Sequence, residues 1–111
     1  GFVAATVKGM IDMLNDPDAG IALLKKQEPL IDVEIETARW YLAEELAILT
    51  PEVVKNGISV VDRERYETAA TQVAGAFDLP ITPNMDDYYD SSFLPPLEMR
   101  QIPQAVKDRL E

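Results

Sequence analysis

The 111-residue sequence contains neither cysteine nor histidine. The chain therefore has no thiolate nucleophile, no imidazole base and no disulfide. The usual Cys/His zinc sites and the Glu-x-x-His pairs of a di-iron bundle are excluded for the same reason. Because a cysteine-free chain is compatible with the cytosol and with an oxidising compartment, this absence leaves the compartment open.

Basic residues are also scarce, with ten Lys and Arg against twenty Asp and Glu and a net charge of −10. Such a surface repels phosphate backbones, and no Lys/Arg run or basic-aromatic patch offsets the repulsion. The five glycines are scattered, so there is no glycine-rich phosphate cradle. The composition thus argues against nucleic-acid binding, and 47% hydrophobic residues predict a folded chain of about one small domain.

Long apolar runs are missing, because no stretch approaches the roughly 20 residues of a membrane span. Gly1-Phe2-Val3 leads straight into an amphipathic pattern, with no basic segment and no small-residue cleavage site. We expect no signal peptide in these residues. This beginning is typical of mid-chain sequence, or of a mature product that starts with a tag-derived glycine.

Helical spacing of apolar residues is what the chain has instead, so the predicted class is all-α with five or six helices. The first helix runs from residue 2 and ends at Asn15. Asp16 as N-cap and Pro17 at the first helical position start a second helix to about Lys26. The predicted inward residues of these two helices are Val3, Val7, Met10, Ile11, Leu14, Ile21 and Leu24.

Residues 32–49 carry the clearest helical pattern, with two apolar stripes. One stripe comprises Ile31, Ile35, Ala38, Leu42, Leu46 and Leu49, and the other Trp40, Ala43 and Ala47. Two stripes imply contacts on two sides, so this helix is predicted to be central.

Three further elements complete the predicted order. Thr50-Pro51-Glu52 starts a short helix that Asn56-Gly57 closes with a left-handed glycine. Ile58, Val60 and Val61 fit a short extended segment or, better, a buried approach to Asp62, which caps a helix over 63–77. Its predicted inward residues are Tyr66, Ala69, Ala70, Val73 and Phe77, and a last short helix runs from Ile102-Pro103 to about Leu110.

A long ordered loop, residues 79–96, separates the last two helices. It is polar and proline-rich, and we expect Tyr88, Tyr89, Phe93 and Leu94 to anchor it while its aspartates face solvent. Asn84, Asp86 and Asp90 have oxygen ligands suited to a cation, but the turn glycine and bidentate Glu of an EF-hand are missing. We expect these side chains to cap turns, and we predict no metal site.

Other candidate chemistry is sparse. Glu44 and Glu45 are adjacent on a helix and point about 100° apart, so they cannot readily share one site, and we expect both to be solvated. Arg39, Trp40 and Tyr41 could form a stacking platform for a flat ligand, although packing is the commoner role of such aromatic residues. They are the only ligand-binding candidates, and no catalytic residue or cofactor site is predicted.

Several motifs follow one another in a familiar order. The run FVAATVKGMIDMLNDPDAGIALLKKQEPLID contains an FVRATLKGW-like helix, a D-P-x-A-A-like helix and an N-P-L-I-D-like boundary. LTPEVVKNGISVVDRERYETAATQVAGAFDLP continues with a T-P-x-V, N-G, G-x-V-D and A-F-x-L-P order. Residues 86–96 match D-D-x-F-D-x-S-F-L-P-P. In this order the chain resembles the C-terminal region of ABC-transporter substrate-binding proteins of the taurine/sulfonate/nitrate and thiamine-precursor (hydroxymethylpyrimidine) group.

The resemblance implies that residues 1–111 form a single helical segment, the last third of a two-lobed α/β periplasmic-binding-protein fold, with 79–96 as its closing loop. It further implies an extracytoplasmic or periplasmic location, a small-molecule solute and an ABC permease as partners, and no enzymatic activity. The family's pyrimidine-precursor synthases depend on histidine and cysteine, so their chemistry does not carry over to this chain.

Two alternatives remain beside this hypothesis. A free-standing acidic helical module could bind a basic or apolar partner or self-associate through the two-stripe helix. An enzyme could use only Asp and Glu as acid and base, as glycosidases do, but the predicted elements include no strands to build a cleft.

Overall fold

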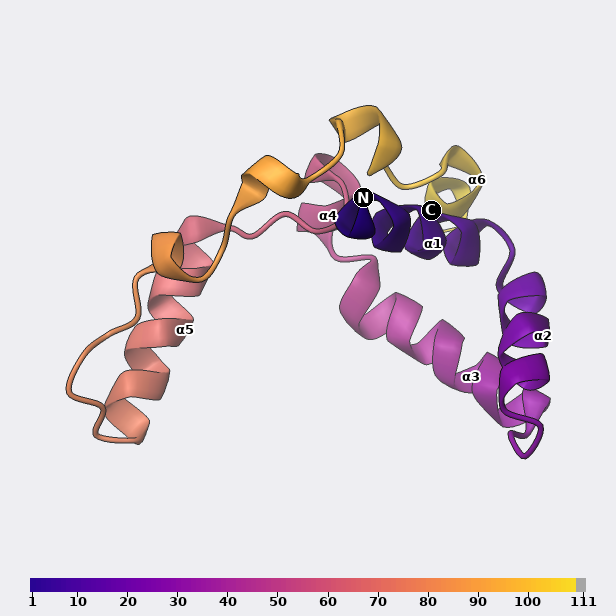
Figure 1. Cartoon of the computed structure of the whole chain (residues 1–111), viewed down its shortest axis with the longest axis horizontal. Coiled ribbons are helices and arrows are strands. Elements are labelled where there is room, and N and C mark those ends of the chain that lie inside the picture. The colour runs from indigo at the N-terminus through magenta and orange to yellow at the C-terminus, as the bar shows by residue number, and fades with distance from the viewer. Residues whose placement is uncertain (110–111) are drawn as a thin grey trace. The chain divides into compact units, whose positions relative to one another are not determined.

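Helices form all the regular structure of residues 1–109, the part of the chain that the computed structural model describes (Figure 1). Six α-helices follow one another: α1 (Phe2–Asn15), α2 (Pro17–Gln27), α3 (Val33–Ala43), α4 (Pro51–Asn56), α5 (Arg63–Ala76) and α6 (Gln104–Asp108). A π-helical turn, η1 (Glu44–Ile48), continues α3. Three 3-10 turns lie between α5 and α6: η2 (Met85–Asp87), η3 (Ser91–Phe93) and η4 (Leu97–Met99). The predicted all-α class is confirmed, and the predicted end of the last helix at Leu110 lies outside the described residues.

The chain divides into two compact units. The larger unit comprises Gly1–Ser59 and the segment that begins at Leu94, and the smaller one comprises Val60–Phe93. None of the described helices is long and apolar enough to cross a membrane.

The starts of α2, α3, α4 and α5 are those that the sequence predicts, because each has a local side-chain cap. The Asp16 carboxylate accepts a hydrogen bond from Ala19 N at 3.0 Å, with Pro17 at the first position of α2. Asp32, Thr50 and Asp62 likewise accept backbone N–H groups at the starts of α3, α4 and α5. Each cap satisfies a donor that the helix leaves unpaired.

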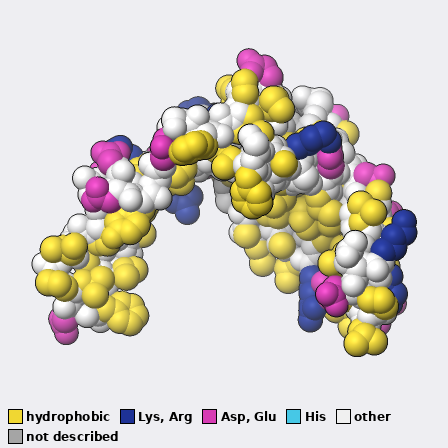
Figure 2. Space-filling model, viewed as in Figure 1, with side chains coloured by type: hydrophobic (Ala, Val, Ile, Leu, Met, Phe, Trp, Pro, Cys, Tyr) yellow, Lys and Arg dark blue, Asp and Glu magenta, His cyan; other side chains and the backbone are white. Residues whose placement is uncertain are grey.

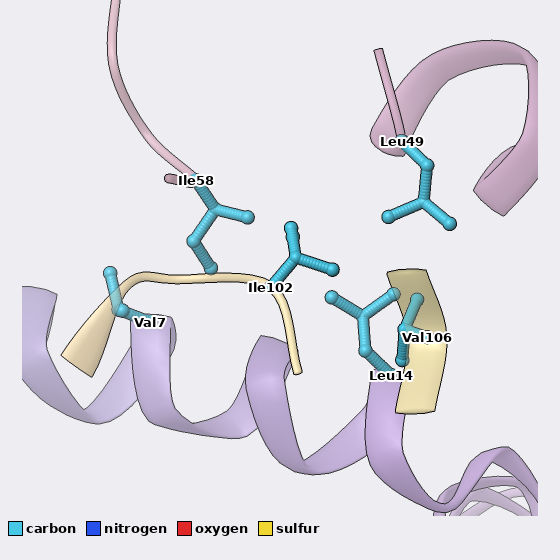
Figure 3. Packing of buried hydrophobic residues seen from close by; sticks show 6 residues of the cluster. All are labelled: Val7, Leu14, Leu49, Ile58, Ile102 and Val106. Carbon is cyan, nitrogen blue, oxygen red and sulfur yellow. The ribbon is translucent and has the colours of Figure 1, made fainter. Parts of the chain in front are cut away.

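The core of the larger unit lies where α1 meets α6 and the ends of η1 and α4. Six buried side chains converge there: Val7, Leu14, Leu49, Ile58, Ile102 and Val106 (Figure 3). Leu14 and Val106 are the largest fully enclosed side chains. Val7 and Leu14 are therefore inward as predicted, and Val3 and Ile11 pack against the cluster.

Arg100 ties the later part of this unit to the end of α4. Its Nε donates to Pro95 O at 2.9 Å and its Nη1 to Ile58 O at 3.1 Å, while Ile58 N donates to Arg100 O at 2.9 Å. Gly57 ends α4 at φ 80°, as predicted, and a Cβ there would lie 2.9 Å from Arg100 O. The close approach and the left-handed backbone together require glycine.

The smaller unit consists of α5 and the turns that follow it. Its buried hydrophobic residues among those described are Ala74 and Met85, and η2 packs against α5. The predicted inward positions Ala69, Val73 and Phe77 are wrong, because each is exposed. The short turns offer α5 too little apolar surface to cover these side chains.

The loop over 79–96 is ordered by its turns, but two of the four predicted anchors are wrong. Tyr88 and Phe93 are exposed, while Tyr89 and Leu94 are half-buried. Met85 and Pro95 are the buried residues of this segment, because η2 turns Met85 toward α5. Asp86, Asp87 and Asp90 are exposed as predicted.

Two further burial predictions are wrong in the larger unit. Met10 and Leu24 are exposed, because the elements packed against α1 and α2 contact other faces of these helices. Ile21, by contrast, is buried as predicted.

Candidate functional site

The predicted central helix is covered on one side only. No residue of α3 is fully buried, and Trp40 is the α3 side chain that packs against the core. Ala43 and Ala47, predicted to share its stripe, are exposed. The prediction of a two-sided helix is therefore wrong for the described residues, because the chain supplies α3 with partners on one face alone.

The uncovered face of α3 and of η1, which continues it, consists of Ile35, Ala38, Leu42 and Leu46, hereafter the α3 stripe. Ile35, Leu42 and Leu46 are 51%, 57% and 71% exposed. Figure 2 shows hydrophobic side chains gathered over α3 on the face in view. Ile31 and Leu49, predicted to belong to the same row, are half-buried and buried instead.

The π-helical turn η1 explains why the row does not continue to Leu49. Leu49 N donates to Glu44 O at 2.9 Å, five residues back rather than four. A wider turn rotates each residue by less than the 100° of an α-helix, so Leu49 leaves the face of Leu46 and enters the core. Such insertions occur frequently at functional sites.

Glu44 is the clearest departure from the predictions. It is 5% exposed rather than solvated, and its Oε1 accepts from Arg109 Nη2 at 2.6 Å. The pair joins residues 65 positions apart, so it is a tertiary contact that brings the end of α6 to η1. Its adjacent residue Glu45 is exposed, as predicted.

Around this pair lies a concavity of about 440 Å³, lined by Tyr41, Glu44, Glu45, Leu49 and Arg109. Its volume falls in the range typical of small-molecule sites, roughly 300–1,000 Å³. We call it the Glu44 concavity. It combines two carboxylates, one guanidinium, one phenol and one aliphatic side chain.

Among residues 1–109, two buried side-chain atoms have no hydrogen-bond partner, Trp40 Nε1 and Glu44 Oε2, and of these two residues Glu44 lines the concavity. One is a donor and the other an acceptor, and their residues lie one helical turn apart. A buried polar atom without a partner costs about 1–3 kcal/mol, so this place in the fold has capacity for a further polar contact.

The three predicted ligand-binding residues do not meet in one site. The Arg39 side chain is exposed and pairs with Glu36 on the same helix. Trp40 packs against the core, and Tyr41 alone lines the Glu44 concavity. Glu44 and Arg109, which complete the concavity, could not be found from the sequence, because no local signal connects them.

The loop residues considered as cation ligands have other partners. Asn84 Oδ1 accepts from Asp86 N at 3.1 Å, and Asp90 Oδ1 accepts from Ser92 N at 2.9 Å. The Asp86 carboxylate forms an ion pair with Arg63. Within residues 1–109 no group of three acidic side chains could hold a metal ion.

These contacts affect two pKa values. Hydrogen bonds from the Ser92 side chain and backbone lower the pKa of the exposed Asp90 carboxyl. The hydrogen bond and charge of Asp86 raise the pKa of Arg63 above its already high value. Both effects stabilise the charged forms at neutral pH and serve the turns of the smaller unit.

Comparison with known proteins adds no relative. No protein-family model, no curated protein and no solved structure matches the chain.

Proposed function

We propose that the chain is the C-terminal helical part of a substrate-binding protein of an ABC importer. The parent protein would lie outside the cytoplasm and enclose a small solute, such as a thiamine pyrimidine precursor or a sulfonate, between two α/β lobes. It would then deliver the solute to an ABC permease. In this proposal the chain has no catalytic activity. The choice of family rests on the ordered motifs from Phe2 to Pro96.

The observation that carries the proposal is the α3 stripe. Fully burying a Leu or Ile side chain contributes about 1.5–3 kcal/mol. Half or more of Ile35, Leu42 and Leu46 is exposed, so covering them would stabilise the protein by on the order of 3–5 kcal/mol. A helix that covers a sheet of the parent protein would present such a face.

The complete reading frame that encodes the chain tests this proposal. We expect upstream of Phe2 a region of alternating strand and helix patterns, long enough for two lobes and preceded by a signal peptide. A frame that begins near Gly1 would refute the proposal. A frame that encodes an unrelated upstream domain would refute it equally.

The same stripe supports a second candidate function, an acidic helical module that binds another protein or a second copy of itself. Three partly exposed aliphatic side chains supply only part of the roughly 800 Å² per partner of a stable interface. We therefore rank self-association below coverage by a larger parent protein. Light scattering separates the two: a concentration-dependent dimer of the 111-residue chain, abolished by Leu42→Ser, would favour the module.

A further inference from the structure

The Met13 thioether fills the space between α1 and α2. Its sulfur lies against the backbone of Gly20, so closely that a Cβ at Gly20 would overlap it. The glycine thus allows the flexible methionine side chain to pack from α1 onto α2. Pro17 and Ile21 are the buried residues of α2. The Met13–Gly20 contact is therefore a substantial part of the packing that holds α2 on α1.

Met13 differs from the other three methionines of the chain in its surroundings. Met10 and Met99 are 36% and 49% exposed, and Met85 is 6% exposed in the smaller unit. Met13 is half-buried, and it also lies in a contact between two helices. It thus combines some access for a small reagent with a packing role that a chemical change of the sulfur would disturb.

A concavity of about 440 Å³ between α1 and α2 gives a small oxidant access to Met13, which is one of its lining residues. Hydrogen peroxide has only two heavy atoms and fits such a space easily. Methionine is oxidised by such reagents to a sulfoxide, which is polar where the thioether is apolar.

We propose that Met13 is an oxidation-sensitive switch, and that its conversion to the sulfoxide by a peroxide weakens the packing of α2 on α1. The sulfur lone pair attacks one peroxide oxygen, and the S–O bond forms as the O–O bond breaks. The other oxygen leaves as hydroxide and takes the proton of the attacked oxygen, which gives water. Sulfur is oxidised and the peroxide is reduced. This inference does not rest on the proposed transport function.

The new oxygen would be poorly accommodated at this place. The Asp12 and Asp16 carboxylates line the concavity and repel a further acceptor oxygen. If the sulfoxide rotates away from them, Gly20 loses its apolar cover. The rival explanation is that the Asn15 amide, the one lining side chain with N–H groups, donates to the sulfoxide and that α2 stays in place.

The test uses the 111-residue chain with Met10→Leu and Met99→Leu, which leaves Met13 and the buried Met85. Both replaced residues are exposed, so this variant should fold. We would treat it with hydrogen peroxide and locate the added oxygen by peptide mass spectrometry. Amide hydrogen exchange would then be compared in α2 and α5. The same variant with Met13→Leu is the matched control, because leucine is apolar and cannot form a sulfoxide.

We expect peroxide to oxidise Met13 and to speed amide exchange in α2 roughly five- to ten-fold, since lost packing favours local opening. Exchange in α5 should not change, and neither should exchange in the Met13→Leu control. Because the sulfoxide is reversible, treatment with methionine sulfoxide reductases A and B should restore slow exchange in α2.

Three results would overturn the proposal. Met13 that stays unoxidised in peroxide that fully oxidises Met10 of the unsubstituted chain would show that the sulfur is inaccessible. Oxidation of Met13 with unchanged exchange in α2 would favour the Asn15 explanation. Equal acceleration in the Met13→Leu control, or in α2 and α5 alike, would place the effect outside the Met13–Gly20 contact.

Discussion

At the scale of single residues, the most demanding position is Gly57. Its φ of 80° and the 2.9 Å approach to Arg100 O leave no room for a Cβ. We predict that Gly57→Ala lowers the free energy of unfolding by about 1–3 kcal/mol, because the left-handed backbone alone costs that much for other residues. Denaturant titration measures the change. Gly9→Ala is the matched control, since a Cβ there meets nothing within 4 Å and should stabilise α1 by about 0.5–1 kcal/mol.

The Arg100 guanidinium donates to three backbone carbonyls, those of Pro95, Asn56 and Ile58. Lysine keeps the charge but lacks the planar fork that reaches Pro95 O and Ile58 O together. We predict that Arg100→Lys costs about 1–3 kcal/mol of unfolding free energy. Arg39→Lys affects only an exposed pair on α3 and should change stability by less than about 0.5 kcal/mol. Equal losses in the two variants would contradict the role of Arg100.

The Asp90 carboxyl makes the stability of the turn at Asp90–Ser92 depend on pH. Hydrogen bonds from Ser92 lower the pKa of Asp90 in the folded state, so they stabilise the turn above the unfolded pKa of about 4. This stabilisation is lost as the pH falls through the lowered folded value. We predict a carboxyl titration midpoint below that of a model peptide, measured by NMR. In Ser92→Ala the midpoint should rise toward the peptide value, and an unchanged midpoint would contradict this cause.

At the scale of helices, a substitution in the α3 stripe should change the unfolding free energy much less than a substitution in the core. Leu42→Ser should reduce the binding of an apolar fluorescent dye while lowering the unfolding free energy by no more than about 1.5 kcal/mol, because Leu42 is more than half exposed. Leu14→Ala should cost about 2–5 kcal/mol, because Leu14 is fully enclosed. A large stability loss in Leu42→Ser would show that the isolated chain already covers the stripe.

The sequence predicts where the helices begin because their caps are local. Asp16, Thr50 and Asp62 each bond to a backbone N–H three residues later, so their neighbours alone determine the geometry. Burial is less predictable, because it depends on what packs against each face. Leu24 and Phe77 have the correct helical spacing, yet no described element covers them.

The Glu44 concavity could not be predicted from the sequence for two reasons: a distant partner buries Glu44, and a π-helical turn interrupts the helical period. Glu44 is buried because Arg109 reaches it from 65 residues away, and no pattern near Glu44 indicates that partner. The π-helical turn also shifts the face of every residue after Ala43, which an α-helical period cannot anticipate. Of the predicted candidates, only Tyr41 lines the concavity.

At the scale of the whole molecule, the described residues bury little apolar surface for their number. The unit Val60–Phe93 encloses only Ala74 and Met85 among its described hydrophobic residues. Segments of fewer than about 40 residues seldom fold alone without a metal, a disulfide or a partner. The chain has no cysteine, and large side chains of both units remain exposed. These features support the proposal that further protein covers the helices.

The central claim is that the α3 stripe is covered in the intact protein. Because these 111 residues contain no cysteine, Leu42→Cys introduces the one thiol of this segment, and its labelling rate, read from the peptide that contains residue 42, reports its exposure in either protein. We would compare this rate in the 111-residue chain and in the product of the complete reading frame, with Lys8→Cys on an exposed position of α1 as reference. The proposal predicts labelling of Leu42→Cys at least about ten-fold slower in the complete product, since covered sites open only by local unfolding. Equal Leu42→Cys rates in the two proteins, or a reading frame that adds nothing to the chain, would contradict it.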